Sequence, residues 1–371
     1  MDIKSVKFDC RHFRSDIPCK PNKLRGKKCT CDEYIQVSHQ ILIIKLGALG
    51  DVIRSTALLT KYRQLYPNAH ITWITHSPDI LPHDGSIDLI GKFEYKTMLP
   101  ILNKEFDIAI NLDKDKEACT VLAQVKAKKK YGYTWADARP DEPFGRGHIA
   151  GCNAAADRKL VTGFFDDESK ANTKSYPQEI FDICELDFQK EEPVLNVNSK
   201  LVDKWKSLKE KSGGKKIIGL NTGCGPRWAT RLWANENWHK LAFDLQKAGY
   251  YPVFLGGQDE DEKNKSFSQI TGAYYPGHYS LEEFIAITAN CDLIVTAVSM
   301  MMHIAIGLKR PLVLFNNIFN KHEFEMYGRG IIVEPTTGCD DFYGNTCTRE
   351  RCCMNDLPVE MVFEAVKKLV P

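Results

Sequence analysis

The sequence predicts an α/β protein made of two Rossmann-like domains that face each other across a central cleft. An apolar run at residues 41–44 passes through a glycine-containing turn at 47–51 into apolar residues spaced for one face of a helix, the first half of a βαβ unit. Residues 217–226 repeat this order, with an apolar run followed by a polar glycine loop. At 371 residues, 43% of them hydrophobic, the chain is too long for one ordinary domain, so two are expected.

Composition excludes several classes of protein. The formal net charge is +2, so no overall field points to a nucleic acid or an acidic membrane as partner. The first residues contain no apolar signal-peptide core, and no window reaches the length of a membrane helix. We therefore expect a cytoplasmic protein with no transmembrane segment and no nucleic-acid partner. Attachment to the surface of the inner membrane is left open.

Strands alternate with helices along the first half of the chain. Short apolar runs at 71–74 and 106–110 predict strands, and residues 176–188 have helical periodicity. The lysines within 126–130 are interpreted as a solvated helix end or turn. Residues 135–174 turn polar and are predicted to form one long irregular loop. This loop contains Arg139, Arg146, His148 and Asn153.

The second half repeats the strand–loop–helix order. Apolar runs at 251–255, 293–296 and 312–315 predict strands that end in polar residues, and a final helix is expected around 359–369. Because ligands of open α/β sheets bind outside the carboxyl ends of the strands, polar residues at these ends are candidates for a site.

The first glycine turn carries one carboxylate, Asp51, at the start of the predicted helix. Glycine allows a ligand to approach the backbone, and the amides of a helix start attract anions. Asp51 is therefore expected to point into a ligand crevice. The alternative is that Asp51 only caps its helix.

Polar groups suited to a nucleotide diphosphate follow the strands of the second half. Thr222 and Gly223 offer hydroxyl and amide donors to phosphate, and Arg231 supplies a cation for charge on a leaving diphosphate. Ser299 and His303 flank a helix start, where backbone amides favour phosphate oxygens. Taken singly, His303 would be a satisfied helix histidine and Arg231 a surface charge; together at successive strand ends they indicate a nucleotide-sugar site.

Acidic residues after the second strand of this half are candidates for the ribose. Asp259 and Glu260 follow Gly256 and Gly257, and acids at strand ends often hold ribose hydroxyls. The methionines at 300–302 are interpreted as packing residues rather than as a cofactor box.

The sequences of these segments resemble those of the heptosyltransferase-type glycosyltransferases of family 9, which have the GT-B fold. The first turn reads KLGALGDVIRSTALL, similar to the opening loop of that family. The resemblance implies that Asp51 is the general base on the acceptor hydroxyl and that Gly47, Gly50 and Arg54 lie on the acceptor side. The polar loop at 135–174 is then expected to cover the acceptor.

The resemblance extends over roughly residues 40–330. The stretch NTGCGPRWATRLWANENWHKLA resembles the donor loop of that family. The resemblance implies that Thr222, Gly223 and Arg231 contact the diphosphate. LGGQDEDE resembles the loop that touches the nucleoside and contributes Gly257, Asp259 and Glu260. CDLIVTAVSMMMHIAIGLKRP resembles the most specific element of the family and contributes Ser299, Met300 and His303. Val298 stands where the family has an aspartate, and Met300 replaces its glycine.

The resemblance implies inverting transfer of a sugar, expected to be heptose, from an ADP-activated donor to a glycan, lipopolysaccharide or protein acceptor. Asp51 would accept the proton of the attacking hydroxyl while Arg231 and His303 stabilise the departing diphosphate. No Asp-x-Asp stands at a plausible donor-loop position, so no catalytic metal is expected. The oligomeric state is left open.

The predicted organisation has four parts. A Cys-rich segment at 1–38 precedes an acceptor-side domain at 39–192 and a nucleotide-sugar domain at 193–335. Residues 336–371 form a second Cys-rich segment and a helix that crosses back to the first domain.

Eight of the thirteen cysteines lie in these two terminal segments. Such segments are poor in apolar residues and need a staple, which in a reducing cytosol favours a metal held by thiolates. We expect one or two structural sites, zinc more than iron; the alternative is free or disulfide-bonded cysteines. The expected ligands are Cys10, Cys19, Cys29, Cys31, Cys339, Cys347, Cys352 and Cys353.

Two other functions stay open at this level. A catalytically silent binding or scaffold protein would keep the fold and use its metal segments for partners, and Val298 favours it. A Rossmann dehydrogenase is disfavoured, because the chain lacks the dinucleotide glycine fingerprint.

Overall fold

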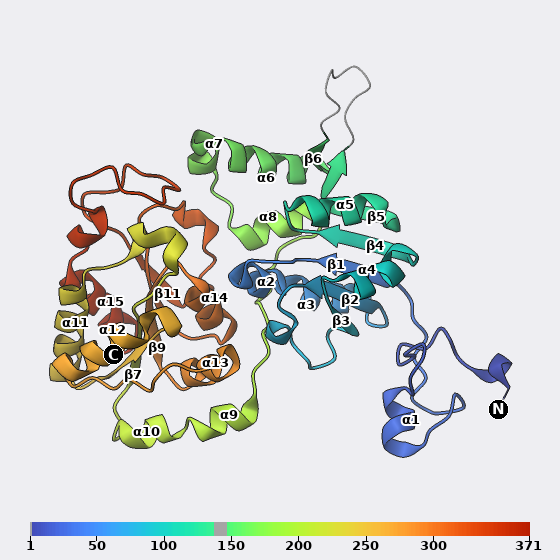
Figure 1. Ribbon diagram of the computed structural model, residues 1–371, viewed down its shortest axis with the longest axis horizontal. Coiled ribbons are helices and arrows are strands. Elements are labelled where there is room, and N and C mark those ends of the chain that lie inside the picture. The colour runs from blue at the N-terminus through green and yellow to red at the C-terminus, as the bar shows by residue number, and fades with distance from the viewer. Residues whose placement is uncertain (1, 137–146) are drawn as a thin grey trace. The chain divides into compact units, whose positions relative to one another are not determined.

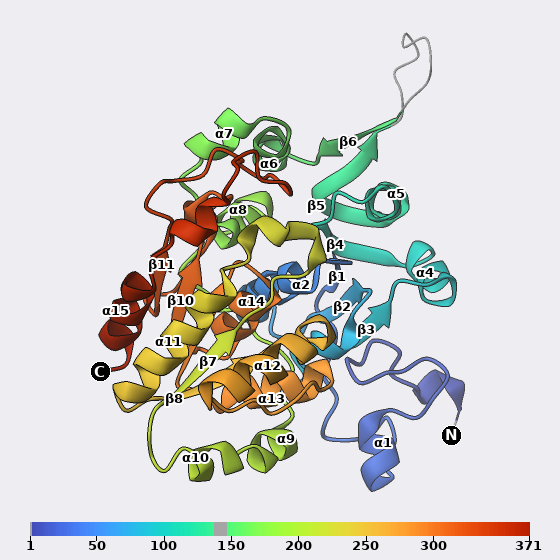
Figure 2. The ribbon, with the colours of Figure 1, turned by 60° about the vertical axis from the view of Figure 1, so that its left-hand side comes forward.

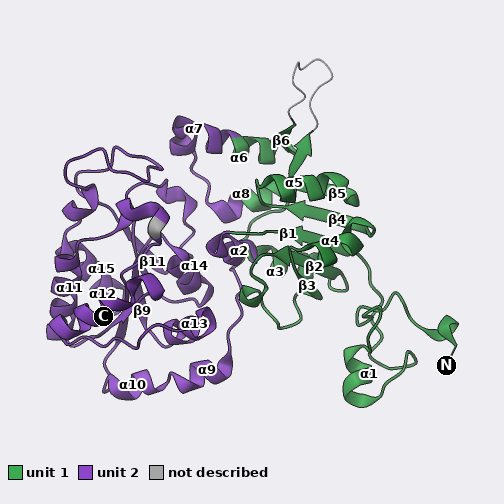
Figure 3. Cartoon of the chain, viewed as in Figure 1, with its two compact units in different colours: residues 1–47, 57–160, 180–191 green, residues 48–56, 161–179, 192–371 purple. Residues whose placement is uncertain are grey.

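The computed structural model describes residues 2–136 and 147–371, and the chain divides into two compact units (Figure 3). The first unit comprises residues 1–47, 57–160 and 180–191, and the second comprises 48–56, 161–179 and 192–371. Each unit contains one largely parallel sheet with helices, so the predicted α/β class is confirmed. Segment 48–56 groups with the second unit although the strand before it belongs to the first.

The first sheet has the order β3-β2-β1-β4-β5-β6, and only the β5–β6 pair is antiparallel. Its central strand is the predicted apolar run, in which Ile41, Leu42, Ile43 and Ile44 are fully buried. A strand covered on both faces selects such a continuous apolar run. The strands are β1 (Gln40–Ile44), β2 (His70–Thr75), β3 (Leu89–Lys92), β4 (Glu105–Asn111), β5 (Lys126–Ala136) and β6 (His148–Gly151).

Helices cover this sheet (Figure 1). Met98 and Ile101 of α4 and Leu122 of α5 pack with Leu42 and Ile44 of β1 in one core cluster. The helical elements of the first unit are η1 (Ile3–Ser5), α1 (Lys20–Arg25), α3 (Ala57–Leu65), η2 (Pro78–Ile80), α4 (Tyr95–Leu102) and α5 (Lys116–Gln124). Two further helices, α6 (Ala154–Phe164) and α8 (Tyr176–Ile183), pass from one unit to the other.

Two predictions for the first half are wrong. The lysine run is not a helix end, because it begins β5, whose residues pair in parallel with β4. The lysines stay in solvent, and Lys128 pairs with Asp107 of β4 at 2.7 Å, so an exposed charge run coexists with a strand. The predicted irregular loop at 135–174 instead contains β6, α6 and α7 (Asp166–Ala171). Of its named residues, Arg139 and Arg146 lie outside the described residues.

The second sheet is fully parallel, with the order β11-β10-β9-β7-β8 (Figure 2). Three of its strands, β7, β9 and β10, are buried at every residue, as the apolar runs predicted. The strands are β7 (Ile217–Asn221), β8 (Tyr251–Leu255), β9 (Leu293–Ala297), β10 (Leu312–Phe315) and β11 (Gly330–Val333).

An aromatic cluster of Trp233, Trp238 and Phe315 fills the core on one face of this sheet, with ring centroids 5.0–5.5 Å apart. The final helix α15 (Val359–Leu369) has the predicted bounds, and its buried residues Val362 and Val366 belong to this core. That face is thus used inside the second unit, and the predicted crossover to the first domain is wrong for the helix itself.

The remaining helices of the second unit connect its strands (Figure 1). They are α2 (Leu49–Ser55), α9 (Ser199–Lys204), α10 (Ser207–Lys211), η3 (Pro226–Arg231), α11 (Asn235–Lys247), η4 (Gln258–Glu260), α12 (Asp261–Thr271), α13 (Leu281–Ala289), α14 (Met300–Gly307), η5 (Lys321–Glu323) and η6 (Cys353–Asp356). Across residues 2–136 and 147–371, no helix has both the length and the apolar character needed to cross a membrane.

Candidate active site

Asp51 lies in the first turn of α2 and is partly exposed, with 33% of its side chain accessible. The residue that caps this helix is Ala48, so Asp51 is not the N-cap. Its Oδ1 lies 2.8 Å from Nη2 of Arg54, one turn further along the same helix. The carboxylate is therefore presented at a helix start together with its own cation.

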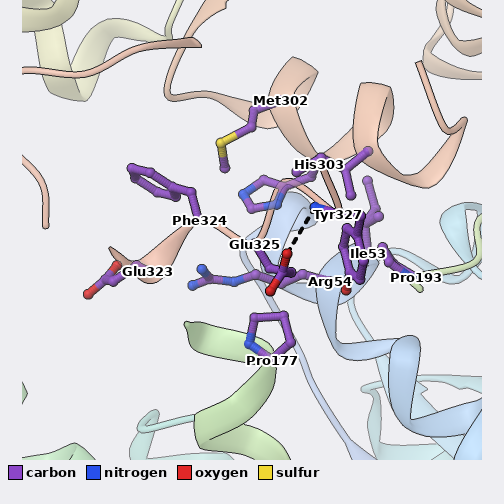
Figure 4. A pocket seen from close by; sticks show the side chains of 11 residues that line it. Ile53, Arg54, Pro177, Pro193, Met302, His303, Glu323, Phe324, Glu325 and Tyr327 are labelled. Carbon is purple, nitrogen blue, oxygen red and sulfur yellow. Dashed lines mark hydrogen bonds between the residues drawn. The ribbon is translucent and has the colours of Figure 1, made fainter. Parts of the chain in front are cut away.

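Arg54 is largely buried and lies over an aromatic ring. Its side chain lies near Pro177 in the pocket (Figure 4). The guanidinium carbon lies 3.3 Å from the centroid of the Tyr176 ring, which is contributed by α8. Arg54 also lines a cavity of about 20 Å³ with Pro177, His303 and Glu323. Only about one water molecule fits such a space, so it has no room for a sugar. The acceptor contact predicted for Arg54 stays a prediction.

His303 lies against the backbone of α2. A Cβ atom added to Gly50 would lie 2.2 Å from Cδ2 of His303, so only glycine allows this histidine ring to pack there. Burial, with a further contribution from the charge of Arg54, lowers the pKa of His303 to about 3. The ring is thus neutral near pH 7. It can donate one hydrogen bond but carries no charge.

Arg231 is buried, with 6% of its surface accessible, instead of extending into solvent. Nη1 donates to the carbonyl of Val298, and Nη2 donates to the carbonyl of Cys224 at 2.9 Å. Burial lowers the pKa of Arg231 from its ordinary value. Arg231 therefore ties the loop after β7 to the start of α14, the helix that carries His303.

The loop after β7 is held by residues of α12 and η4. Thr222 Oγ1 donates to Oδ1 of Asn264 at 2.7 Å, and Nζ of Lys263 donates to the Thr222 carbonyl at 3.0 Å. A Cβ on Gly223 would lie 2.2 Å from the Glu260 carboxylate, so Gly223 allows the closest approach of this acid to the loop. Thr222, Gly223 and Glu260 are thus brought together, as predicted for a donor site.

Other predicted donor residues differ in their surroundings. Gly257 donates its amide to Oε2 of Glu260 at 2.9 Å, whereas Asp259 is exposed. Ser299 is the N-cap residue of α14, and its Oγ lies 3.2 Å from the hydroxyl of Thr296. Met300 is half-buried at the first position of that helix.

The loop after β1 has an anchor that the sequence did not reveal. Lys45 Nζ pairs with Asp113 Oδ1 at 2.5 Å, and both side chains are buried. Asp113 also accepts the amide of Leu46, the residue before the predicted acceptor residue Gly47. The space around Gly47 is open. A buried ion pair at the carboxyl ends of β1 and β4 therefore fixes the entry to the loop.

The four N-terminal cysteines line one cavity of about 180 Å³, together with His12. Of the described residues before β1, only Pro21 is fully buried, so this segment has almost no apolar core. Within residues 2–136 and 147–371, however, no three His, Cys, Asp or Glu side chains are placed to hold a metal ion. The N-terminal metal site stays a prediction.

The C-terminal cysteines form two neighbouring pairs. Burial raises the pKa of Cys339 to about 12 and that of Cys352 to about 11, and each thiol has a second thiol within hydrogen-bonding reach, Cys353 and Cys347 respectively. Cys352 donates to the carbonyl of Thr230 at 3.5 Å. The second Cys-rich segment therefore touches the donor loop next to Arg231.

Sequence reasoning missed four residues of these sites, and most lacked a local signal. Lys263 could have been found, because it lies one helical turn beyond Asp259 in the same glycine-led segment. Tyr176, Asn264 and Asp113 contact their partners only through the fold.

Solved structures share this fold. The crystal structure of a family 9 glycosyltransferase from Veillonella parvula matches with a TM-score of 0.67 and 19% identity, over 90% of this chain and 97% of that chain. The iron-containing dodecameric heptosyltransferase TibC, from enterotoxigenic E. coli and solved with ADP-D-beta-D-heptose, matches with a TM-score of 0.51 and 12% identity, over 91% of this chain and 78% of that chain. The fold of this chain is thus that of known GT-B-type glycosyltransferases.

The model of glycosyltransferase family 9 (heptosyltransferase) matches residues 96–328, more than half of the chain. Lipooligosaccharide heptosyltransferase 2 of Haemophilus influenzae is 23% identical over 309 residues, which cover 74% of this chain and 82% of that protein. The chain belongs to glycosyltransferase family 9, and it is a glycosyltransferase.

Proposed function

We propose that this enzyme transfers heptose from ADP-heptose to a hydroxyl group, with inversion at the anomeric carbon. The observation that carries the proposal is that Asp51 pairs with Arg54, and its neighbour Gly50 lies against His303, where α2 packs on α14, while Arg231 holds the start of α14. A carboxylate thus stands beside the helix whose first residues the family uses for the donor.

The reaction needs one base and stabilisation of one leaving group. The acceptor oxygen attacks the anomeric carbon, its proton passes to Asp51, and the bond from that carbon to the diphosphate oxygen breaks with its electron pair going to ADP. A guanidinium within reach of the diphosphate oxygens stabilises that charge. Arg231 would do so by exchanging its backbone carbonyl partners for phosphate. His303, being neutral, contributes at most one N–H.

Donor recognition is assigned to the loop after β7 and the helix start that follows β8. Thr222 and Gly223 would receive phosphate oxygens, and Glu260 with Asp259 would bind ribose hydroxyls. Lys263 adds a cation that already reaches the Thr222 carbonyl at 3.0 Å. TibC, solved with ADP-D-beta-D-heptose, supports an ADP-activated donor.

The acceptor is proposed to be a hydroxyl group of a lipopolysaccharide core, another glycan or a protein, reached in the cytoplasm. A named relative acts on lipooligosaccharide, which supports the first of these. No divalent metal is assigned to the chemistry.

We further propose that the terminal cysteines hold zinc or iron in structural sites. Thiolates suit both ions, four cysteines share one N-terminal cavity, and a relative of this fold contains iron. Such an ion cross-links a segment that lacks an apolar core. Metal analysis of full-length protein purified without chelator tests this: about one equivalent or more of zinc or iron is expected, falling in Cys19→Ser but not in Cys291→Ser, a buried control in the second unit. Absence of both metals would reject the proposal.

The function is tested by release of the nucleoside diphosphate from a panel of ADP-heptose, ADP-glucose and UDP-glucose, with and without a heptose-acceptor glycan. Release from ADP-heptose is expected in the wild type and should fall about 1,000-fold in Asp51→Asn, the range for loss of a general base. Asp166→Asn is the matched control, because Asp166 is exposed and also lies in the first turn of a helix. No release from any sugar nucleotide, with no stabilisation by ADP, would favour the scaffold alternative.

A further inference from the structure

Arg54 is a cation in a place where charge is costly. It lies one turn after Asp51, on the same face of α2, and its side chain is only 18% accessible. Its Nε is buried without a hydrogen-bond partner. A buried guanidinium with an unused donor lowers stability, because the desolvation of that group is not fully compensated. The position of Arg54 therefore calls for a reason other than stability.

The guanidinium is held in one orientation. Its carbon lies 3.3 Å from the centroid of the Tyr176 ring, where cation–π attraction is strong. Lysine cannot reproduce this contact. Because Nη2 lies 2.8 Å from Oδ1 of Asp51, a fixed guanidinium also holds that carboxylate oxygen in place.

Several other titratable groups surround the pair. They are His303 on α14, Tyr176 on α8, Glu323 in η5, Glu325 beyond it, and Tyr343 in the C-terminal segment. Burial alone lowers the pKa of Arg54, but the charge of Asp51, with contributions from Tyr176, Glu323 and Tyr343, raises it above its ordinary value. Glu323 accepts from the Tyr343 hydroxyl at 2.6 Å. Arg54 stays charged, whereas His303 stays neutral and does not compete for Asp51.

We infer that Arg54 is a positioning residue for the general base: clamped on Tyr176, it sets the orientation and the charge of the Asp51 carboxylate before the acceptor hydroxyl arrives. This inference rests on the proposed function and replaces the acceptor-binding role predicted for Arg54. The cavity of about 20 Å³ beside Arg54 agrees with it, since no sugar enters there. The proton still passes from the hydroxyl to Asp51, and Arg54 neither gains nor loses one.

The test measures ADP release from ADP-heptose as a function of pH in Arg54→Met, Arg54→Lys, Tyr176→Phe and Tyr176→Leu. Arg54→Met is expected to lower kcat about 100-fold with KM for the donor within about twofold, because misplacing a catalytic group by about 1 Å costs this much. Arg54→Lys should recover part of the loss. Tyr176→Phe keeps the ring, so its kcat should match that of the wild type. The kcat of Tyr176→Leu should fall about tenfold.

The pH profile separates positioning from a general structural effect. A guanidinium favours the ionised form of a neighbouring carboxylate, so its removal should move the acidic limb of the kcat/KM profile up by about one pH unit. Arg329→Met is the matched control, because Arg329 pairs with Glu192 at the same 2.8 Å in the same unit and is also mostly buried. Its profile should not move.

A double variant completes the test. Arg54→Met should cost little further activity in the Asp51→Asn background if Arg54 acts through Asp51. Equal losses in both backgrounds, or an unmoved acidic limb in Arg54→Met, overturn the inference. If wild type releases no ADP or Asp51→Asn keeps full activity, the proposed function has failed instead.

Discussion

Two glycine loops follow the first strands, in chain order, of the two sheets, and the charged side chains that they carry differ in exposure. The loop after β1 leads to Asp51, which is a third exposed, and is anchored by the buried pair of Lys45 and Asp113. The loop after β7 leads to Arg231, which is buried against two backbone carbonyls. The first loop presents its functional charge in advance. The second holds its charge inside the protein, so a phosphate ligand must displace a carbonyl to reach it.

The anchor of the first loop should give the largest effect. Lys45→Met leaves the Asp113 carboxylate buried and unpaired, so it should destabilise the protein by about 3 kcal/mol or more. Urea unfolding of the full chain measures the loss. Lys45→Met/Asp113→Asn, which removes the charge but keeps an acceptor for the Leu46 amide, should recover at least half of it. Equal loss in both variants would mean that the pair is not the anchor.

The contact of the first loop with α14 comes next. Gly50→Ala places a methyl group where the His303 ring lies, and overpacking of this kind costs about 2 kcal/mol. The melting temperature and the rate of ADP release should both fall. Gly47→Ala is the control, because nothing lies near its Cβ position and its backbone is not left-handed. If both alanine variants behave alike, packing on His303 does not shape this loop.

The neutrality of His303 gives a pH effect. Its pKa is lowered to about 3 in the folded protein, from 6.5 in an unfolded chain. Between these values the unfolded state binds one more proton, so stability falls as the pH falls, by about 2 kcal/mol from pH 7 to pH 5. His303→Gln should lack this contribution and lose correspondingly less stability over the same range, as read from urea unfolding at both pH values. An identical pH dependence in the two proteins contradicts a neutral His303.

The second loop should respond least in stability and mainly in ligand affinity. Arg231→Met should weaken ADP binding about tenfold, the loss of one charge-assisted hydrogen bond. Calorimetric titration with ADP measures this, and Arg227→Met, at an exposed position of the same loop, should bind normally. Unchanged affinity in Arg231→Met would show that Arg231 stays with its carbonyl partners and only braces the loop.

Most of the fold was predictable from the local sequence. The runs that became β1, β7 and β9 are buried at almost every residue, and a continuous apolar segment has few alternatives to such a strand. The charged start of β5 was missed, because pairing with β4 outweighed the polar composition of that run. Tertiary context decides such cases, since the intrinsic preference for a strand is weak.

The positions of the candidate site residues in the fold were predictable, but their burial and charge state were not. Asp51, Thr222 and His303 follow strand ends, and that position is encoded locally. The burial of Arg231, the neutrality of His303 and the contact of Arg54 with Tyr176 depend on neighbours distant in sequence. Residue type alone did not reveal that Arg231 is buried or that His303 is neutral.

The carbonyl of Thr230 accepts hydrogen bonds both from the Cys352 thiol and from the amide of Asn317. Oxidation of Cys352 removes one of these donors from the residue adjacent to Arg231. If Arg231 binds the diphosphate as proposed, ADP titrations made in air and under reductant should give different affinities.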